Sequence, residues 1–221
     1  MRTTDDMKTG LSRSDEPRTS KGQATKKRII SSAARLIHAN GYKNTSLEDI
    51  LAEAEIKKGS FYFHFDNKDL LGHAVIDRFY SGTQKMMDSA LKPAINGEAN
   101  ALESIERMFD SLTVFMDTNN CRGGCLLGNM ALEISDYNDD LRRHLADIFA
   151  DMASRLEEAI AAGQSRGEIA ADATAKELSH FIVSVMEGGL MLARVSKETI
   201  PMSDSIKSAL MVLKPKHTEE E

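Results

Sequence analysis

Apolar residues recur at helical spacing along most of the chain. A short amphipathic helix is predicted after Thr45 or Ser46, either of which can cap it, and a second short helix after Lys57. Beyond Asn67 a long helix is expected to run to about Leu91, where Lys92-Pro93 ends it and Asn96-Gly97 forms a turn. Further helices are predicted at about 99–117, 125–136, 139–163, 173–196 and 203–213. No segment alternates as a strand does and no repeat is found, so the pattern predicts an all-α chain.

The segment from Thr45 to Lys68 carries the chemistry of a DNA-binding helix-turn-helix. Its second half places hydrogen-bond donors on Ser60, Tyr62 and His64 between aromatic residues that can pack inward. Gly59 leaves room for a DNA backbone to approach closely. An enzyme core would gain little from such an arrangement.

The run Lys-Lys-Gly-Ser-Phe-Tyr-Phe-His-Phe-Asp-Asn-Lys-Asp-Leu-Leu, which begins at Lys57, resembles the recognition-helix signature of the TetR family of bacterial regulators. The usual pattern is Lys-Gly-Thr/Ser-Leu/Phe-Tyr-x-His/Tyr-Phe-x-x-Lys-x-x-Leu. Upstream, the similarity includes the first helix and the turn that follows it, at Ile29, Ala33, Leu36, Ile37 and Gly41-Tyr42. Together the similar residues span about 24 to 75.

The resemblance implies a three-helix DNA-binding domain followed by a larger helical domain for ligand binding and dimerisation. We expect a disordered N-terminal arm at 1–23, the helix-turn-helix domain at 24–70, the ligand and dimer domain at 71–215 and an acidic tail at 216–221. A basic arm can reach the minor groove of DNA, although an ordinary frayed terminus is the simpler reading.

Two kinds of DNA contact are expected from the helix-turn-helix. Phosphate contacts are assigned to Thr45, Ser46, Ser60, Tyr62, His64 and Lys68, with Gly59 allowing close approach. Base contacts are assigned to Lys57, Lys58 and Phe63. The chain departs from the family pattern at Lys57, where Ser or Thr is frequent, and at Phe63, where His is frequent, so the operator sequence cannot be taken from relatives.

The distribution of charge supports two functional regions. The 221 residues carry a net charge of −6, yet residues 21–68 hold nine Lys/Arg against five Asp/Glu, and residues 69–221 hold fifteen against twenty-five. A basic head suits phosphate, and an acidic body discourages contact with DNA. No 18-residue apolar run or signal core is evident, so a cytoplasmic protein without a membrane partner is expected. No cofactor is indicated.

Apolar stripes on the predicted helices at 139–163 and 173–196 could be simple core. The family resemblance instead implies that these two helices pair with their counterparts in a homodimer, with Gly188-Gly189 permitting close helix approach. Two recognition helices would then lie about one DNA turn, roughly 34–36 Å, apart on a pseudopalindrome.

The segment Cys121-Arg-Gly-Gly-Cys-Leu-Leu-Gly-Asn-Met130 is the second informative motif. Cys125 is placed at a helix N-terminus near Arg122, and both features would lower the pKa of its thiol. The segment resembles the Gly-Cys-Leu motif of the NemR- and AcuR-like regulators. That resemblance implies electrophile or oxidant sensing at Cys125, whereas Cys121 lies outside the motif.

A conventional noncovalent effector remains an equal alternative. Its pocket is expected among helices 99–191, with flexible or aromatic candidates at Phe109, Phe115, Met116, Met130, Phe149, Met152, Phe181 and Met186. Two further alternatives are weaker. A metal site from Cys121, Cys125 and His144 or His180 lacks a second ligand pair, and a thiol-dependent enzyme using Cys125 lacks a motif that orients a base. We therefore expect a regulator that is not an enzyme and holds no metal.

Overall fold

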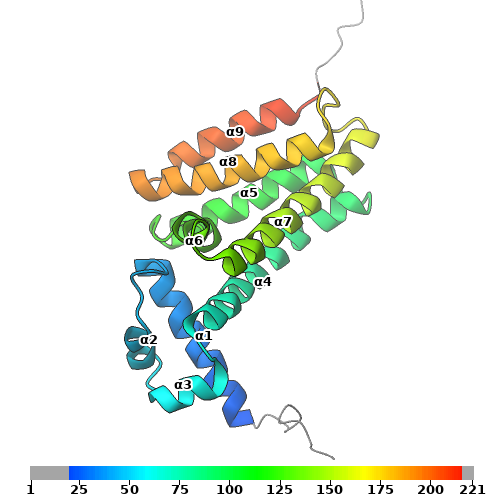
Figure 1. Ribbon diagram of the computed structural model, residues 1–221. Coiled ribbons are helices and arrows are strands. Elements are labelled where there is room, and N and C mark those ends of the chain that lie inside the picture. Colours follow the sequence, from blue (N-terminus) through cyan, green and yellow to red (C-terminus); the bar gives the residue numbers. More distant parts are fainter. Residues whose placement is uncertain (1–19, 216–221) are drawn as a thin grey trace, which may run out of the picture.

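The computed structural model describes residues 20–215, and within that range the chain is all-α. The helices are α1 (Ser20–Asn40), α2 (Leu47–Glu53), α3 (Lys58–His64), α4 (Lys68–Ile95), α5 (Ala101–Thr118), α6 (Leu126–Ile134), α7 (Asp139–Ser165), α8 (Ala175–Ser196) and α9 (Ile200–Leu213). Figure 1 shows α1 to α3 as a head at one end, from which α4 leads into a body built by α5 to α9. The predicted fold class is confirmed.

The head is held together by a small core beneath α3. Ile29, Ile50 and Phe61, one from each of its three helices, are fully buried. Ser46 caps α2, because its hydroxyl accepts the Asp49 N–H while the Asp49 carboxylate accepts the Ser46 N–H. These contacts fix α3 with its other side turned to the outside.

Two predicted boundaries need correction. α1 begins at Ser20, so the expected arm at 1–23 extends too far, and Thr25 Oγ1 donates to the Lys21 carbonyl within the first helical turns. The rest of the expected arm, at 1–19, and the tail at 216–221 lie outside the described residues. α4 also continues through Pro93 to Ile95. A proline in the last turn removes only one donor, and the Pro93 carbonyl accepts from the backbone of the turn that follows, so the helix tolerates it.

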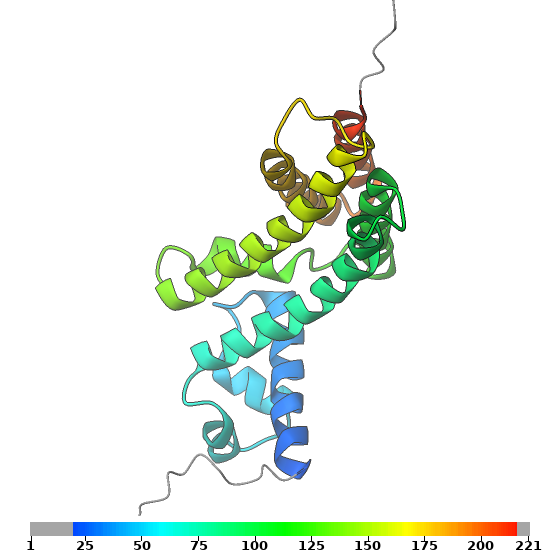
Figure 2. The same cartoon turned by 90° about the vertical axis from the view of Figure 1, so that its right-hand side faces the viewer.

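The apolar stripe of α7 proves to be core. Leu141, Leu145, Met152, Leu156 and Ile160 are all buried within the protomer. The largest group of exposed apolar residues in the body lies instead on α8 and α9. These two helices pack side by side (Figures 1 and 2). On α8 the exposed apolar residues are Phe181, Met191, Leu192 and Val195, and on α9 they are Ile200, Met211 and Val212. The apolar face of α7 is therefore already covered within the protomer and does not support the expectation that α7 supplies half of a dimer interface.

A tight turn carries the chain into α6 directly above the end of α1. Gly123 and Gly124 both have left-handed backbone angles, with φ of +79° and +67°. The Gly124 carbonyl lies 2.9 Å from His38 Nε2, and a Cβ on Gly123 would stand 2.3 Å from the same ring. Glycine is needed here for both conformation and space.

We expect Gly123→Ala to lower the free energy of unfolding more than Gly167→Ala does. Gly167 has a similar φ of +70° but nothing within 4 Å of its Cβ position, so it reports backbone strain alone, about 1–2 kcal/mol. Displacing the hydrogen-bonded His38 ring should add at least about 1 kcal/mol. Urea unfolding measures both variants, and equal losses would show that the His38 contact is energetically neutral.

Candidate DNA-contacting surface and effector cavity

The outer side of α3 presents cations and aromatic rings. Lys57, Lys58 and Gly59 are exposed, Phe63 is 81% exposed and Tyr62 is 46% exposed, while Ser60 and His64 are partly covered. Phe61 and Phe65 anchor the inner side through buried aromatic contact. Such a surface can donate hydrogen bonds to phosphates and place side chains in a groove.

Three of the residues to which we assigned phosphate contacts make contacts within the head instead. Thr45 is fully buried and its hydroxyl donates to the Gly41 carbonyl at 2.7 Å, so the expectation that it contacts DNA is wrong. The Ser46 hydroxyl serves the cap of α2. Lys68 Nζ donates to the Tyr42 carbonyl and lies over the Tyr42 ring, and burial lowers its pKa. Thr45 and Lys68 thus hold the head together rather than reach outward.

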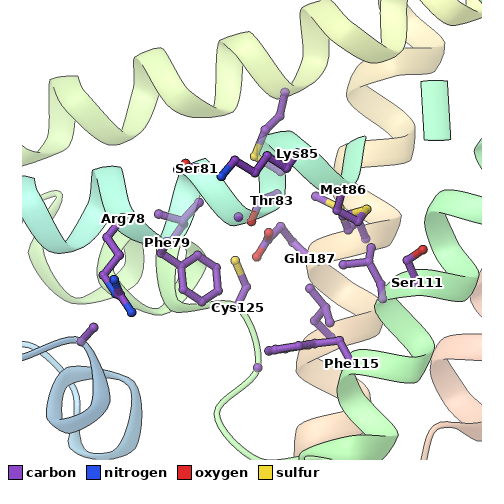
Figure 3. Close-up of a pocket in the computed structure, with 18 residues that line it drawn as sticks. Arg78, Phe79, Ser81, Thr83, Lys85, Met86, Ser111, Phe115, Cys125 and Glu187 are labelled. Atoms are coloured by element: carbon purple, nitrogen blue, oxygen red, sulfur yellow. The ribbon is translucent and has the colours of Figure 1, made fainter. Parts of the chain in front are cut away.

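A cavity of about 630 Å³ lies in the body close to the head (Figure 3). Most of its wall comes from α4, α5, α6 and α8, with Ala34 from α1 and Met152 from α7. The apolar lining is Phe79, Met86, Leu112, Phe115, Leu127, Met152, Met186 and Leu190. Its volume suits a drug-sized apolar compound.

Only some of the predicted pocket residues line the cavity. Phe115, Met152 and Met186 line this cavity. The other candidates do not line it: Phe109, Met116 and Met130 are buried in the core, Phe149 packs against that core, and Phe181 is exposed on α8. Helical periodicity marks these side chains as apolar, but it does not say which of them border empty space.

Cys125 lies in the cavity wall, but its surroundings oppose the expected reactivity. It is the N-cap of α6, where its Sγ accepts the Gly128 N–H at 3.4 Å. Burial and the neighbouring Glu187 carboxylate nevertheless raise the pKa of the thiol well above its usual range. Arg122 is exposed and lines a separate hollow with Cys121. The expected lowering of the Cys125 pKa is therefore wrong.

Glu187 is the functional candidate that sequence reasoning missed. Its carboxyl group lies close enough to the Cys125 thiol to help raise the thiol pKa, and burial raises the pKa of Glu187 itself. Oε1 is buried without a hydrogen-bond partner among the described residues. The available signal was a lone acidic residue between Met186 and Gly188 in an otherwise apolar stretch of α8.

The cavity wall also touches the head directly. His38 at the end of α1 contacts the carbonyl of Gly124, next to Cys125. At the other end of α6, Glu133 Oε2 accepts the Lys43 N–H at 3.0 Å. α6 and the turn before it therefore join one wall of the cavity to the head.

The structure does not assemble the metal site considered from sequence. His144 stacks on His73, with 2.8 Å between their Nδ1 atoms, and its Nε2 lies 2.9 Å from Asp77. Within residues 20–215 no group of three or more His, Cys, Asp and Glu side chains is placed to hold a metal ion.

Comparison with known proteins identifies the class to which this architecture belongs. The model for bacterial regulatory proteins of the tetR family matches residues 29–75, and the model for the tetracyclin repressor-like C-terminal domain matches residues 101–209. Sequence and fold therefore both define a helix-turn-helix head joined to a larger helical C-terminal domain. The chain belongs to the TetR family of transcriptional regulators.

The relatives are named transcriptional regulators. The HTH-type transcriptional repressor DhaR of Mycobacterium sp. (strain GP1) is 26% identical over 85% of this chain and 91% of its own length. The transcriptional regulator AcuR of Cereibacter sphaeroides is 26% identical over 79% and 78%, respectively. The HTH-type transcriptional repressor NemR of Escherichia coli K12 is 20% identical over 82% and 90%. This chain thus spans most of each relative.

Solved structures share the fold. A regulatory protein TetR from Rhodobacter sphaeroides superposes with a TM-score of 0.78 at 24% identity, covering 85% of this chain and 97% of its own. A cysteine variant of the TetR-family regulator CifR, crystallised with 26-bp operator DNA, gives a TM-score of 0.71 at 19% identity, covering 89% and 98%.

We expect Glu187→Gln to speed alkylation of Cys125 by iodoacetamide at pH 8, by roughly threefold or more. Glutamine keeps the shape but removes the negative charge that helps to raise the thiol pKa, so more thiolate forms. Trypsin cleaves after Arg122 and separates Cys121 from Cys125, which lets mass spectrometry follow each thiol. Unchanged Cys125 alkylation would mean that burial alone controls it.

Proposed function

We propose that this chain is a transcriptional repressor that binds a pseudopalindromic operator as a homodimer and leaves it when a small molecule fills the cavity beside Cys125. The supporting observation is that one loop belongs to both sites: Gly124 contacts His38 of the head, and Cys125 lines the cavity. A ligand that displaces this loop acts directly on the position of the head.

The proposed DNA contacts follow the exposed side of α3. Tyr62 and the partly covered Ser60 and His64 are assigned to phosphates, and Lys57, Lys58 and Phe63 to base edges. Ser46 remains a weaker candidate because its hydroxyl already caps α2. The family relationship supports DNA binding by this head, and a structure of the similarly folded CifR holds operator DNA.

The proposed dimer joins α8 and α9 of two protomers. The outer face of α8 carries a row of residues at spacings of seven, four and three, as in the contact line of a helix bundle. These residues are Phe181, Gly188, Leu192 and Val195. Gly189 instead faces α9 of its own protomer, where a Cβ would meet Met202. Among the described residues α8 is the one helix long and apolar enough to cross a membrane by length and composition alone. We assign its apolar surface to the dimer, with the cytoplasm as the place of action.

We propose that the effector causes release of DNA by shifting the equilibrium between two states of the dimer. α4 carries the head and also forms a wall of the cavity through Phe79 and Met86. A ligand that fits the cavity better in one arrangement of α4 and α6 favours that arrangement and the separation of the heads that goes with it. The ligand needs no covalent step.

A covalent route through Cys125 is the second candidate, supported by the position of this thiol in the cavity wall. Its raised pKa makes the reaction slow, and the same property disfavours a thiol-dependent enzyme, which needs a ready thiolate. The covalent route requires that modification confined to Cys125 releases DNA from the native protein and that Cys125→Ser abolishes this release.

Fluorescence anisotropy with the DNA upstream of the protein's own gene tests the proposed function. We expect the protein to bind this DNA tightly. Added salt, unlabelled operator and a ligand of the cavity should each release the labelled DNA. Binding to every DNA alike, with no sequence preference, would contradict an operator-specific repressor.

We expect Tyr62→Phe to weaken operator binding by about tenfold or more. The variant lacks the hydroxyl that donates a hydrogen bond to a charged phosphate group in each half of the operator. Tyr137→Phe removes the same hydroxyl from an exposed tyrosine of the body and should leave affinity unchanged. Anisotropy titrations compare the two. Equal affinity of Tyr62→Phe and native protein would remove Tyr62 as a phosphate contact.

We expect Gly188→Leu to convert the dimer into a monomer, because nothing lies within 4 Å of its Cβ position inside the protomer and the new side chain must enter the dimer contact. Ala161→Leu, on the exposed side of α7, serves as the control. Light scattering during size-exclusion chromatography gives the masses. A dimeric Gly188→Leu variant would place the interface elsewhere.

A further inference from the structure

The cavity contains one strongly polar acceptor that the protein leaves unsatisfied. Glu187 Oε1 has almost no solvent contact and no hydrogen-bond partner within residues 20–215. A buried carboxylate oxygen without a donor costs free energy, and natural proteins pair such groups. The deficit points to a partner that is not part of the chain.

The surrounding residues hold this carboxyl group in place. The Cys125 thiol is its neighbour, and Gly128 makes room for it, since a Cβ at position 128 would stand 2.2 Å from Oε2. Figure 3 shows the Glu187 side chain extending from α8 toward Cys125 among the cavity-lining residues. The position is therefore built by contacts from both α6 and α8.

The rest of the lining decides what can pair with Glu187. The buried lining is apolar apart from the Cys125 thiol, and the hydroxyls of Ser81, Thr83 and Ser111 add only neutral polarity. The two cations of the wall, Arg78 and Lys85, are exposed to solvent. Glu187 is thus the only acidic residue lining the cavity, and no lysine, arginine or histidine of the buried lining neutralises it.

We propose that the effector is an apolar organic amine whose ammonium group pairs with the Glu187 carboxylate. This inference rests on the proposed function and specifies the ligand class of its cavity. An ammonium group supplies both the missing donor and a compensating charge, while the apolar body of the ligand contacts Phe115, Met152 and Met186. A neutral donor would satisfy the oxygen but would not stabilise the ionised carboxylate, which burial disfavours.

A matched set of probes tests this assignment by isothermal titration calorimetry at pH 7 on the full-length protein. The probes are 4-phenylbutylamine, 4-phenylbutan-1-ol, 5-phenylpentan-2-one and 4-phenylbutanoate, which share an apolar body and differ in the polar end. We expect the amine to bind the native protein about tenfold or more tightly than the alcohol. In Glu187→Gln this preference should fall to about twofold or less, while affinity for the alcohol is retained.

Glu158→Gln, which removes an exposed carboxylate from α7, is the matched control and should keep the preference for the amine. The proposal is overturned if the alcohol, ketone or carboxylate binds as tightly as the amine, if Glu187→Gln keeps the preference, or if the amine does not bind at millimolar concentration.

Operator binding, followed separately by anisotropy, keeps the two proposals distinguishable. An amine that binds through Glu187 without releasing DNA would contradict the release mechanism and leave the ligand site standing. Release of DNA by the ketone or the carboxylate, with no effect of the amine, would contradict the ligand class and leave the repressor standing.

Discussion

The packing of α4 against α7 is the constraint on which the rest of the molecule depends. α4 is the continuous helix that leaves the head and enters the body, so its attachment to α7 fixes where α3 lies. Polar contacts accompany the apolar packing along its length: Asn138 with Asp69, His144 with His73 and Asp77, Asp151 with Tyr80, and Arg155 with Asp88. Such directional contacts define one register of the two helices, because sliding either helix by a turn would leave several polar groups unpaired.

That attachment and the cavity share one helix. The face of α4 that carries Phe79 and Met86 borders the cavity, while residues on other faces of α4 contact α7. α6 borders the cavity as well, and the chain reaches the head through Gly124 in the turn before α6 and through Glu133 near its end. The head is therefore held from two directions, by the α4 backbone and by the ends of α6, and a ligand between those helices meets both supports.

The sequence predicted the elements well and the site only in part. Capping at Ser46, the recognition signature and the turn at Asn96-Gly97 are local features, readable from a few adjacent residues. The position of empty space is not local: Phe109 and Phe115 lie on one helix, yet only Phe115 borders the cavity. The prediction of a lowered Cys125 pKa failed for the same reason, since the neighbouring Glu187 is 62 positions away on α8. The predicted apolar stripes of α7 and α8 are both mostly buried core, and the exposed apolar residues of α8 lie on another face, which only tertiary packing reveals.

The contact between His38 and the Gly123-Gly124 turn limits how freely the two domains can be exchanged. Joining this body to the head of a relative at the start of α4 would preserve the covalent connection and much of the α4 packing. The foreign α1 would still need a side chain that fits against Gly123 and donates to the Gly124 carbonyl. A hybrid without that fit would keep two folded domains but lose the contact between the end of α1 and the turn before α6. The two domains can therefore be exchanged only together with the last turn of α1.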